Sequence, residues 1–303
     1  MARRRKSGRN IHGILLLDKR QGVSSNRVLQ EVRRLFDANK AGHTGSLDPL
    51  ATGLLPVCFG EATKVSSYLL DTDKRYRADV KLGVTTDSGD AEAVIPEKKP
   101  VPDFDDQEIE ACLNRFVGEI DQVPPMYSAL KHEGQRLYKL AREGRIVERK
   151  PRRITIFELS LLSCKNDVMT IDVNCSKGTY IRTLAEDIGL SLGCGGTITA
   201  LRRLEVGKLT IDNAWTLEKL QDIDNDARLL ECLIPVDHVL SSWPAINLKE
   251  DQKCFIRQGQ QVELPDTKVR GIVRMYSDKA FLGIGEILSN GKLAPKRLFN
   301  VIH

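Results

Sequence analysis

Paired cysteines and long apolar runs are both absent from the 303-residue sequence. Its seven cysteines are odd in number and form no C-x-x-C pair, which is the spacing that a zinc site or a redox motif needs. We therefore expect reduced cysteines in a reducing compartment. No apolar stretch approaches the roughly 20 residues of a membrane span, and the apolar run at residues 14–17 is too short for a signal peptide. These absences predict a soluble, cytoplasmic protein that is not secreted.

The motifs that bind nucleotide cofactors are missing too. Neither G-x-x-x-x-G-K-[ST] nor G-x-G-x-x-G occurs in the chain. His43 is one of only five histidines, and no second histidine or acid lies near it at ligand spacing. A metal role is therefore not expected for His43, and a loop or stacking role is favoured. The sequence predicts neither a metal nor a cofactor.

Positive charge is concentrated in two places. The net charge is +5, but the first ten residues carry five basic side chains and no acid, and without them basic and acidic residues balance at 41 each. A second basic segment, residues 131–153, holds nine Lys or Arg against three Glu. This segment is either a solvated helix face or an arm that contacts phosphates, and charge alone favours neither.

Hydrophobic periodicity indicates a mixture of helices and strands. Residues 75–82 and 169–175 alternate apolar and polar side chains, which is the pattern of half-buried strands. Ser24 precedes apolar residues at helical spacing, and residues 181–188 carry an apolar helical stripe. Because there is no regular βαβ alternation, we expect an α+β fold with a mixed, largely antiparallel sheet and flanking helices.

The two ends of the chain differ from its middle. From about residue 250 the sequence changes to short strands, and Asn290-Gly291 between apolar runs is a strong hairpin signal. We expect a small all-β appendage there. Residues 1–10 are polar and highly charged and have little to bury, so we expect a basic, flexible tail.

A glycine-rich stretch, residues 41–53, is the most unusual segment of the chain. Within it, Asp48-Pro49 has an ordinary structural explanation, since aspartate at an N-cap followed by proline at the first helical position is a common helix start. The glycines suit tight turns, although close approach of a ligand to the backbone uses the same property. On these residues alone, the structural interpretation is favoured over a catalytic one.

Residues 42–56, GHTGSLDPLATGLLP, resemble the catalytic signature of the TruB family of tRNA pseudouridine synthases. The resemblance extends over nearly the whole chain. Other stretches similar to the family occur in the family's order at residues 16–26, 73–77, 124–131, 176–182 and 201–204. Two residues depart from the family pattern: Arg20 stands where proline is usual, and Ser46 where alanine is usual.

The resemblance implies a domain organisation. Residues 11–248 are expected to form a catalytic domain with the pseudouridine synthase fold, and residues 249–303 a small, β-barrel-like PUA domain that binds RNA. Residues 124–153 correspond to the insertion with which the family clasps tRNA, so the resemblance favours phosphate contact for the basic segment. The side chains implied to contact the tRNA backbone are Lys131, Arg136, Arg142, Arg149 and Arg152.

The implied activity is isomerisation of the T-loop uridine of tRNA, position 55 in conventional tRNA numbering, to pseudouridine. The uridine is flipped out of its stack, an aspartate attacks it, the glycosidic bond breaks, the base turns and a C–C glycoside forms. The resemblance makes Asp48 the nucleophile, with Arg182 as the partner that keeps it charged. Such a nucleophile needs a normal or depressed pKa. The residues leave open attack at uracil C6, attack at ribose C1′ and a glycal route.

Further roles follow from the resemblance alone. Tyr76 is implied to be catalytic and to form the stacking platform for the base, and His43 to prise open or fill the gap in the T-loop. Tyr180, Leu201 and Lys19 complete the implied substrate site. Each role has a structural alternative, because a core aromatic on a strand or a packing residue on a helix would look the same. The number of ordered motifs favours the functional interpretation.

The expected partner is tRNA, bound through its T-arm, with no membrane and no obligatory protein partner, and we expect a monomer. Two other functions are compatible with the residues. One is a guide-dependent pseudouridine synthase of related fold that acts on ribosomal RNA, and the clasping insertion argues against it. The other is a non-catalytic tRNA-folding protein in which Asp48 merely caps a helix, and an Asp48→Asn variant distinguishes it.

Overall fold

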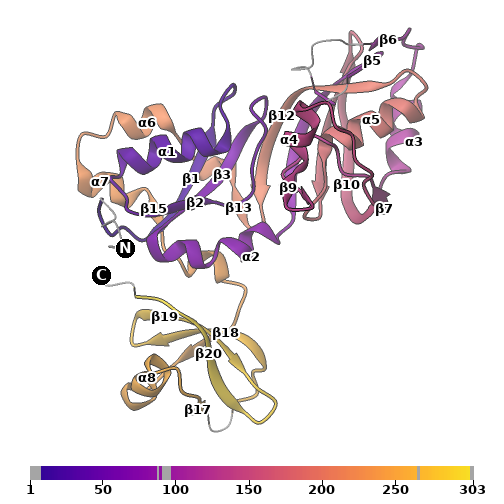
Figure 1. The fold of residues 1–303 in the computed structure, drawn as a ribbon. Helices are drawn as coiled ribbons and strands as arrows, with labels where there is room; N and C mark the ends of the chain where they lie inside the picture. The colour runs from indigo at the N-terminus through magenta and orange to yellow at the C-terminus, as the bar shows by residue number, and fades with distance from the viewer. Residues whose placement is uncertain (1–7, 87–88, 91–96, 265–266, 301–303) are drawn as a thin grey trace.

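The computed structural model describes residues 8–86, 89–90, 97–264 and 267–300. Most of the expected basic tail, residues 1–7, lies outside the described residues. Figure 1 shows a large sheet with helices packed along it and a small second sheet formed by the C-terminal part of the chain. The chain therefore has the α+β architecture predicted from its periodicity.

The large sheet contains eleven strands within the described residues, in the principal order β14-β1-β3-β12-β4-β11-β10-β7. Its strand pairs are antiparallel except β1–β14 and β3–β12, so the prediction of a mixed, largely antiparallel sheet is confirmed in the described part of the chain. The strands are β1 (Gly13–Lys19), β2 (Ala41–His43), β3 (Thr52–Phe59), β4 (Lys74–Leu82), β7 (Gly118–Gln122), β10 (Arg152–Lys165), β11 (Val168–Cys175), β12 (Gly196–Val206), β13 (Leu209–Thr210), β14 (Trp215–Thr216) and β15 (Leu233–Ile234).

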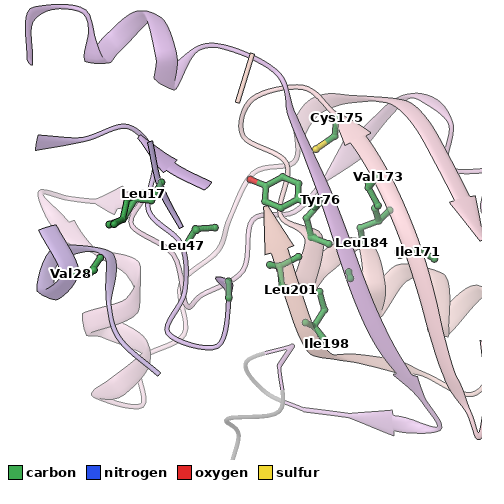
Figure 2. Packing of buried hydrophobic residues seen from close by; sticks show 14 of the residues in the cluster. Leu17, Val28, Leu47, Tyr76, Ile171, Val173, Cys175, Leu184, Ile198 and Leu201 are labelled. Carbon is green, nitrogen blue, oxygen red and sulfur yellow. The ribbon is translucent and has the colours of Figure 1, made fainter. Parts of the chain in front are cut away.

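Alternating burial explains the central strands. In β4, Tyr76, Ala78 and Val80 are buried while the intervening side chains face the other side of the sheet, as the sequence pattern predicted. The buried side packs against α5 (Ile181–Ser191), whose apolar stripe includes Leu184. Figure 2 shows Leu184 beside this core, with Tyr76 at the core's edge.

Local capping explains where the helices begin. The helix α1 (Ser25–Leu35) follows Ser24, whose side chain accepts a hydrogen bond from the backbone N–H of Arg27 at 3.2 Å. Its apolar face is buried, which confirms the helix start predicted from the sequence. The other helices are α2 (Ser66–Leu70), α3 (Asp106–Asn114), α4 (Leu137–Arg142), α6 (Leu217–Gln221), α7 (Asp226–Glu231) and α8 (Glu250–Arg257), with 3₁₀ turns η1 (Gly60–Lys64), η2 (Ile211–Asn213) and η3 (His238–Leu240).

A close crossing of β3 and β12 lies at the centre of the large sheet. Gly53 of β3 pairs with Arg203 of β12, and Gly53 has a positive φ of 100°. A Cβ atom on Gly53 would lie 2.3 Å from the carbonyl oxygen of Arg203, so only glycine fits here. This crossing brings the loop before β3, which contains Asp48, next to β12 and its other neighbour β4.

The C-terminal sheet has the order β16-β18-β19-β20-β17. Its strands are β16 (Ala245–Asn247), β17 (Val262–Glu263), β18 (Gly271–Ser277), β19 (Ala280–Ile287) and β20 (Lys292–Leu298). The antiparallel pair β19–β20 confirms the hairpin predicted at Asn290-Gly291. The expected small C-terminal β domain is confirmed, but it is not all-β, because α8 lies within it and buries Ile256 in the core of this sheet.

An apolar interface joins the two sheets. Phe281, Ile284 and Phe299 of the C-terminal part belong to one buried cluster together with side chains of β1 and β3. At its rim, Lys64 Nζ donates a hydrogen bond to the Leu298 carbonyl at 2.7 Å. The C-terminal sheet is thus packed against the large sheet rather than tethered to it by a linker alone.

The basic insertion has a small core of its own. It contains β8 (Lys131–His132), β9 (Gln135–Arg136) and α4, held by a cluster around Met126, Leu137 and Leu140. A separate pair of short strands, β5 (Val84–Thr85) and β6 (Glu97–Lys98), follows β4. Because the insertion has this apolar core, it presents its charged side chains from a packed unit.

Candidate active site

Asp48 lies in a loop between β2 and β3, and this loop contains no helix. The backbone N–H of Ala51 donates to the Asp48 carbonyl at 3.1 Å, which closes a turn. Ser25 fixes the other side of the loop, since its Oγ donates to the Leu47 carbonyl at 3.0 Å and accepts from the Leu47 N–H at 2.8 Å. The interpretation of Asp48 as a helix N-cap is therefore wrong.

Lys19 lies directly beneath this loop. Its side chain is fully buried, and its ammonium donates hydrogen bonds to the carbonyls of Arg20, Pro49 and Ala51. The resemblance implied substrate contact for Lys19, and in the structure its ammonium binds carbonyl groups of the loop backbone. Lys19 thus supports the loop that carries Asp48 and places a positive charge behind it.

The departure at Arg20 leaves the local turn intact. The N–H of Gly22 donates to the Pro49 carbonyl at 2.8 Å, so this turn still braces the Asp48 loop. The Arg20 side chain extends to α1, where its Nη2 lies 2.9 Å from Glu31 Oε2. The second departure, Ser46, is exposed.

Arg182 links two carboxylates. Its Nε lies 3.0 Å from Asp48 Oδ2 and its Nη1 lies 3.5 Å from Asp90 Oδ2, while its Nη2 donates to the Tyr127 carbonyl at 2.6 Å. The Arg182 side chain is only 6% exposed, whereas that of Asp48 is 43% exposed. The predicted ion pair between Asp48 and Arg182 is therefore present, with Asp48 on the open side. Sequence reasoning missed Asp90, which no local motif marks.

The environment of Asp48 raises the pKa of its carboxyl above the ordinary value. Burial is the largest cause, and the positive charge of Arg182 opposes it. Asp90 adds to the upward shift through like-charge repulsion, and Lys19 opposes it. A normal or depressed pKa was expected for Asp48, and this expectation was wrong because burial outweighs the positive charge of Arg182. Arg182 is what limits the rise.

Tyr76 and Leu201 lie on neighbouring strands at the edge of the core nearest the Asp48 loop. Tyr76 is 8% exposed and Leu201 is 9% exposed, so both residues are almost fully buried. Figure 2 shows the phenol hydroxyl of Tyr76 on the side of the loop residue Leu47, with Leu201 below the ring. Burial raises the pKa of Tyr76, and the nearby Arg203 guanidinium acts in the opposite direction.

His43 ends β2, just before the Asp48 loop. Burial lowers the pKa of its imidazole, and the positive charge of Arg203 lowers the pKa further. Its Nδ1 is buried and has no hydrogen-bond partner among the described residues. The ring is therefore kept neutral to lower pH than an ordinary histidine, which suits contact with an uncharged base.

Tyr180 directly precedes α5, the helix that contains Arg182. The Gln122 side chain makes two hydrogen bonds to the Tyr180 backbone. Its Oε1 accepts from the Tyr180 N–H at 2.8 Å, and its Nε2 donates to the Tyr180 carbonyl at 3.1 Å. Burial raises the pKa of the Tyr180 phenol, while Arg152 and Arg182 lower it. Tyr180 thus lies close enough to Arg182 and Asp48 for their charges to act on its phenol.

The five basic residues expected to contact tRNA differ in exposure. Lys131, Arg136, Arg142 and Arg152 are exposed. Arg149 is half-buried, and its Nη1 donates to the Pro124 carbonyl at 3.1 Å. Arg149 therefore holds the base of the insertion in this structure.

Glu186, one turn after Arg182 in α5, has an unusual carboxyl that sequence reasoning did not identify. Burial raises its pKa from 4.5 to about 7, although Arg182 pulls the pKa down. Between these two pH values the folded protein retains a proton that the unfolded chain has lost, so stability falls as pH rises through this window.

We expect Glu186→Gln to raise the unfolding temperature relative to the unsubstituted protein at pH 8 and to leave it unchanged near pH 4.5. Glutamine cannot ionise, so it removes the destabilising charge that exists only above this window. Thermal unfolding followed by circular dichroism at both pH values measures the difference. An equal shift at both would show that packing, not ionisation, is responsible.

Two kinds of feature are absent from the described residues. No group of three or more His, Cys, Asp or Glu side chains there could hold a metal ion. Among the helices of the described ranges, none is long and apolar enough to cross a membrane.

Sequence models of three related domains match successive parts of the chain. TruB family pseudouridylate synthase (N-terminal domain) matches residues 33–181. The tRNA pseudouridylate synthase B C-terminal domain matches residues 182–241, and the pseudouridine synthase II TruB C-terminal domain matches residues 244–299. Together these matches contain Asp48, Tyr76 and Arg182.

Curated relatives align along almost their whole length. The tRNA pseudouridine synthase B of Chromohalobacter salexigens is 54% identical, and the alignment covers 99% of this chain and 98% of the relative. Proteins of the same name from Nitrosococcus oceani and Pseudomonas syringae pv. syringae are 51% and 50% identical, with at least 97% of each chain covered.

Solved structures support the fold. A chain in the structure of an H/ACA RNP bound to a substrate RNA containing 2'-deoxyuridine aligns with a TM-score of 0.72 and 21% identity, covering 99% of this chain and 92% of that chain. A chain in a Cbf5-Nop10-Gar1 complex aligns with a TM-score of 0.71 and 23% identity, covering 95% and 84%. At these identities the likeness concerns the fold alone. The matched domains and the full-length relatives establish that the chain belongs to the TruB family of pseudouridine synthases.

Proposed function

We propose that this protein isomerises uridine 55 in the T-loop of tRNA to pseudouridine without a metal or cofactor. The observation that carries the proposal is the partly exposed Asp48, held by the buried Arg182 beside Tyr76. The full-length relatives named tRNA pseudouridine synthase B support tRNA as the substrate. The reaction is an isomerisation, so the residues need supply no atom, electron or energy-rich donor.

Asp48 acts as the nucleophile in this proposal. The uridine leaves the stack of the T-loop, and the Asp48 carboxylate attacks it so that the N-glycosidic bond breaks. The uracil then turns within the site, its C5 bonds to ribose C1′, and the bond between Asp48 and the substrate breaks, which returns the free carboxylate. C5 loses a proton and N1 gains one, which leaves the overall composition unchanged. Arg182 keeps Asp48 ionised and oriented while the base is bound.

The surrounding side chains hold the detached base. Tyr76 offers its ring as the stacking platform for the base, while Leu201 and Tyr180 form the walls that exclude water. Neutral His43 occupies the place of the flipped uridine in the T-loop, because an uncharged ring stacks on bases without costly desolvation. Lys19 supports the Asp48 loop from below.

The rest of the chain serves tRNA binding in this proposal. Residues 11–248 form the catalytic domain, residues 124–153 clasp the tRNA arm, and residues 249–303 form a PUA-like RNA-binding domain. Cys58, Cys175 and the other described cysteines are free, which supports a cytoplasmic location. We propose that the protein acts as a monomer without an obligatory protein partner.

Binding to tRNA is expected to weaken steeply with salt, because each neutralised phosphate releases counterions. The guanidinium carbons of Arg136 and Arg142 lie 6.0 and 5.7 Å from the centre of the Tyr138 ring. The two positive charges are therefore gathered at one place on the insertion. Changing both arginines to glutamine should reduce the slope of log Kd against log salt by about 1.5 to 2. Filter binding at salt concentrations from about 50 to about 300 mM measures this slope.

Arg153 provides the matched control. It is also exposed, but it already lies 3.4 Å from both Glu119 and Asp121, so its charge is partly neutralised within the protein. Arg153→Gln should therefore change the slope less than either arginine next to Tyr138. A slope that does not respond to the Arg136 and Arg142 changes would place phosphate contact elsewhere.

Mapping the modified position tests the proposed substrate. An unmodified tRNA transcript is incubated with the protein and then treated with carbodiimide, which makes reverse transcriptase stop at pseudouridine. A single stop in the T-loop supports position 55, and a transcript with cytidine at that position should give no stop. Modification at other positions of the same transcript would contradict the proposed site specificity.

A further inference from the structure

Arg203 is the largest fully buried side chain of the described residues, at 1% exposure. It lies on β12, in register with both Tyr76 of β4 and Gly53 of β3. Its Nε donates to the Leu54 carbonyl at 2.7 Å, and its Nη2 donates to the Gly45 carbonyl at 3.1 Å. Gly45 lies in the loop that carries Asp48 and Leu54 lies in β3, so one guanidinium ties this loop to the strand that follows it.

The charge of Arg203 has no carboxylate partner at ion-pair distance among the described residues. Its neighbour Arg202 differs, since it is 40% exposed and its Nη2 lies 2.6 Å from Asp18 Oδ2. A buried cation without a carboxylate is costly, and such groups persist where their charge or geometry is used. The field of Arg203 reaches the active site, because this charge lowers the pKa of both His43 and Tyr76.

Resting on the synthase activity proposed above, we propose that Arg203 is a positioning residue for the reaction. Its guanidinium fixes the loop that carries Asp48 and places a buried positive charge behind His43 and Tyr76. The fork geometry of arginine allows both carbonyls to be bound at once, which a lysine ammonium at the same place cannot reproduce. Arg203 acts only through these groups, since its side chain is too deeply buried to contact RNA.

Arg203→Lys separates the loop contact from the charge. We expect the single-turnover rate at saturating tRNA to fall about 100-fold, because a displacement of about 1 Å in a reacting group has that effect. The Kd for tRNA should change by less than about threefold, since Arg203 makes no surface contact. Arg202→Lys, at the adjacent position, serves as the matched control and should retain the parental rate.

Arg203→Met tests the charge without requiring activity. The titration of the His43 ring, followed by proton NMR and assigned with His43→Gln, should move to higher pH in Arg203→Met and stay in place in Arg203→Lys. If Arg203 had only a structural role, the His43 titration would not differ between Arg203→Met and Arg203→Lys. Thermal unfolding checks that each variant is folded, and the lysine variant remains informative if the methionine variant is not.

The outcomes separate this inference from the proposed function. If the parental protein makes no pseudouridine, the proposed function fails, while the His43 titration still tests the electrostatic effect of Arg203. If the parental protein is active and Arg203→Lys matches its rate, the positioning role is overturned. An unchanged His43 titration in folded Arg203→Met would overturn the electrostatic role.

Discussion

Asp48→Asn is expected to abolish pseudouridine formation while tRNA binding persists. The amide has nearly the shape of the carboxylate and accepts similar contacts, but it is a very poor nucleophile. We expect the single-turnover rate to fall by a factor on the order of 10⁴ or more, the size of effect seen when a nucleophile is removed from a catalytic unit. Asp48 is partly exposed in a loop held by Lys19 and Ser25, so the fold should tolerate the change.

Binding and chemistry must be measured separately for this variant. Filter binding should give a Kd for tRNA within about threefold of the parental value, because the basic insertion is unchanged. Asp71→Asn is a suitable control, since Asp71 is an exposed carboxylate paired with Lys177 at 3.0 Å outside the site. An Asp48→Asn protein as active as the Asp71→Asn control would remove Asp48 from the mechanism.

Arg182→Met is expected to affect both stability and activity. The change removes the ion pairs from Arg182 to Asp48 and Asp90 and the hydrogen bond to the Tyr127 carbonyl. Removing one partner of a buried charge pair costs about 3–5 kcal/mol, so we expect the free energy of unfolding to fall by that amount. Urea denaturation measures the loss.

The same substitution should shift the pH dependence of the reaction in a defined direction. Arg182 is the main cause that lowers the Asp48 pKa against the upward effect of burial. Without it the pKa rises further, so Asp48 becomes protonated at higher pH and the acid limb of the rate profile moves to higher pH. Arg182→Lys keeps a charge and should shift the limb less. An unmoved limb in Arg182→Met would show that Arg182 does not control Asp48 ionisation.

Local patterns in the sequence were sufficient to predict many elements of the fold. The alternation at residues 75–82 and 169–175 corresponds to β4 and β11, because burial on one face of a sheet repeats every second residue. The Asn290-Gly291 hairpin was predictable because its turn chemistry is local. The helix α8 was missed because only Ile256 of it is buried, so it carries no apolar stripe.

The active site was only partly predictable for a different reason. The family motif identified Asp48 and Arg182, and the structure places them 3.0 Å apart. Asp90 joins them through an isolated bridge to Ile198 of β12, and Arg203 through the order of strands in the sheet, and no local pattern reveals either. The raised pKa of Asp48 depends on burial of a loop against distant strands, and this also has no local signature.

One measurement tests the central claim most directly. The protein and its Asp48→Asn variant are each incubated with unmodified tRNA transcript in the presence of a metal chelator and without nucleotide, and the tRNA is digested to nucleosides. Chromatography with mass detection then separates pseudouridine from uridine, which has the same mass. We predict close to one pseudouridine per tRNA with the parental protein and none with Asp48→Asn. No pseudouridine with the parental protein, or equal amounts with both, would contradict cofactor-free catalysis by Asp48.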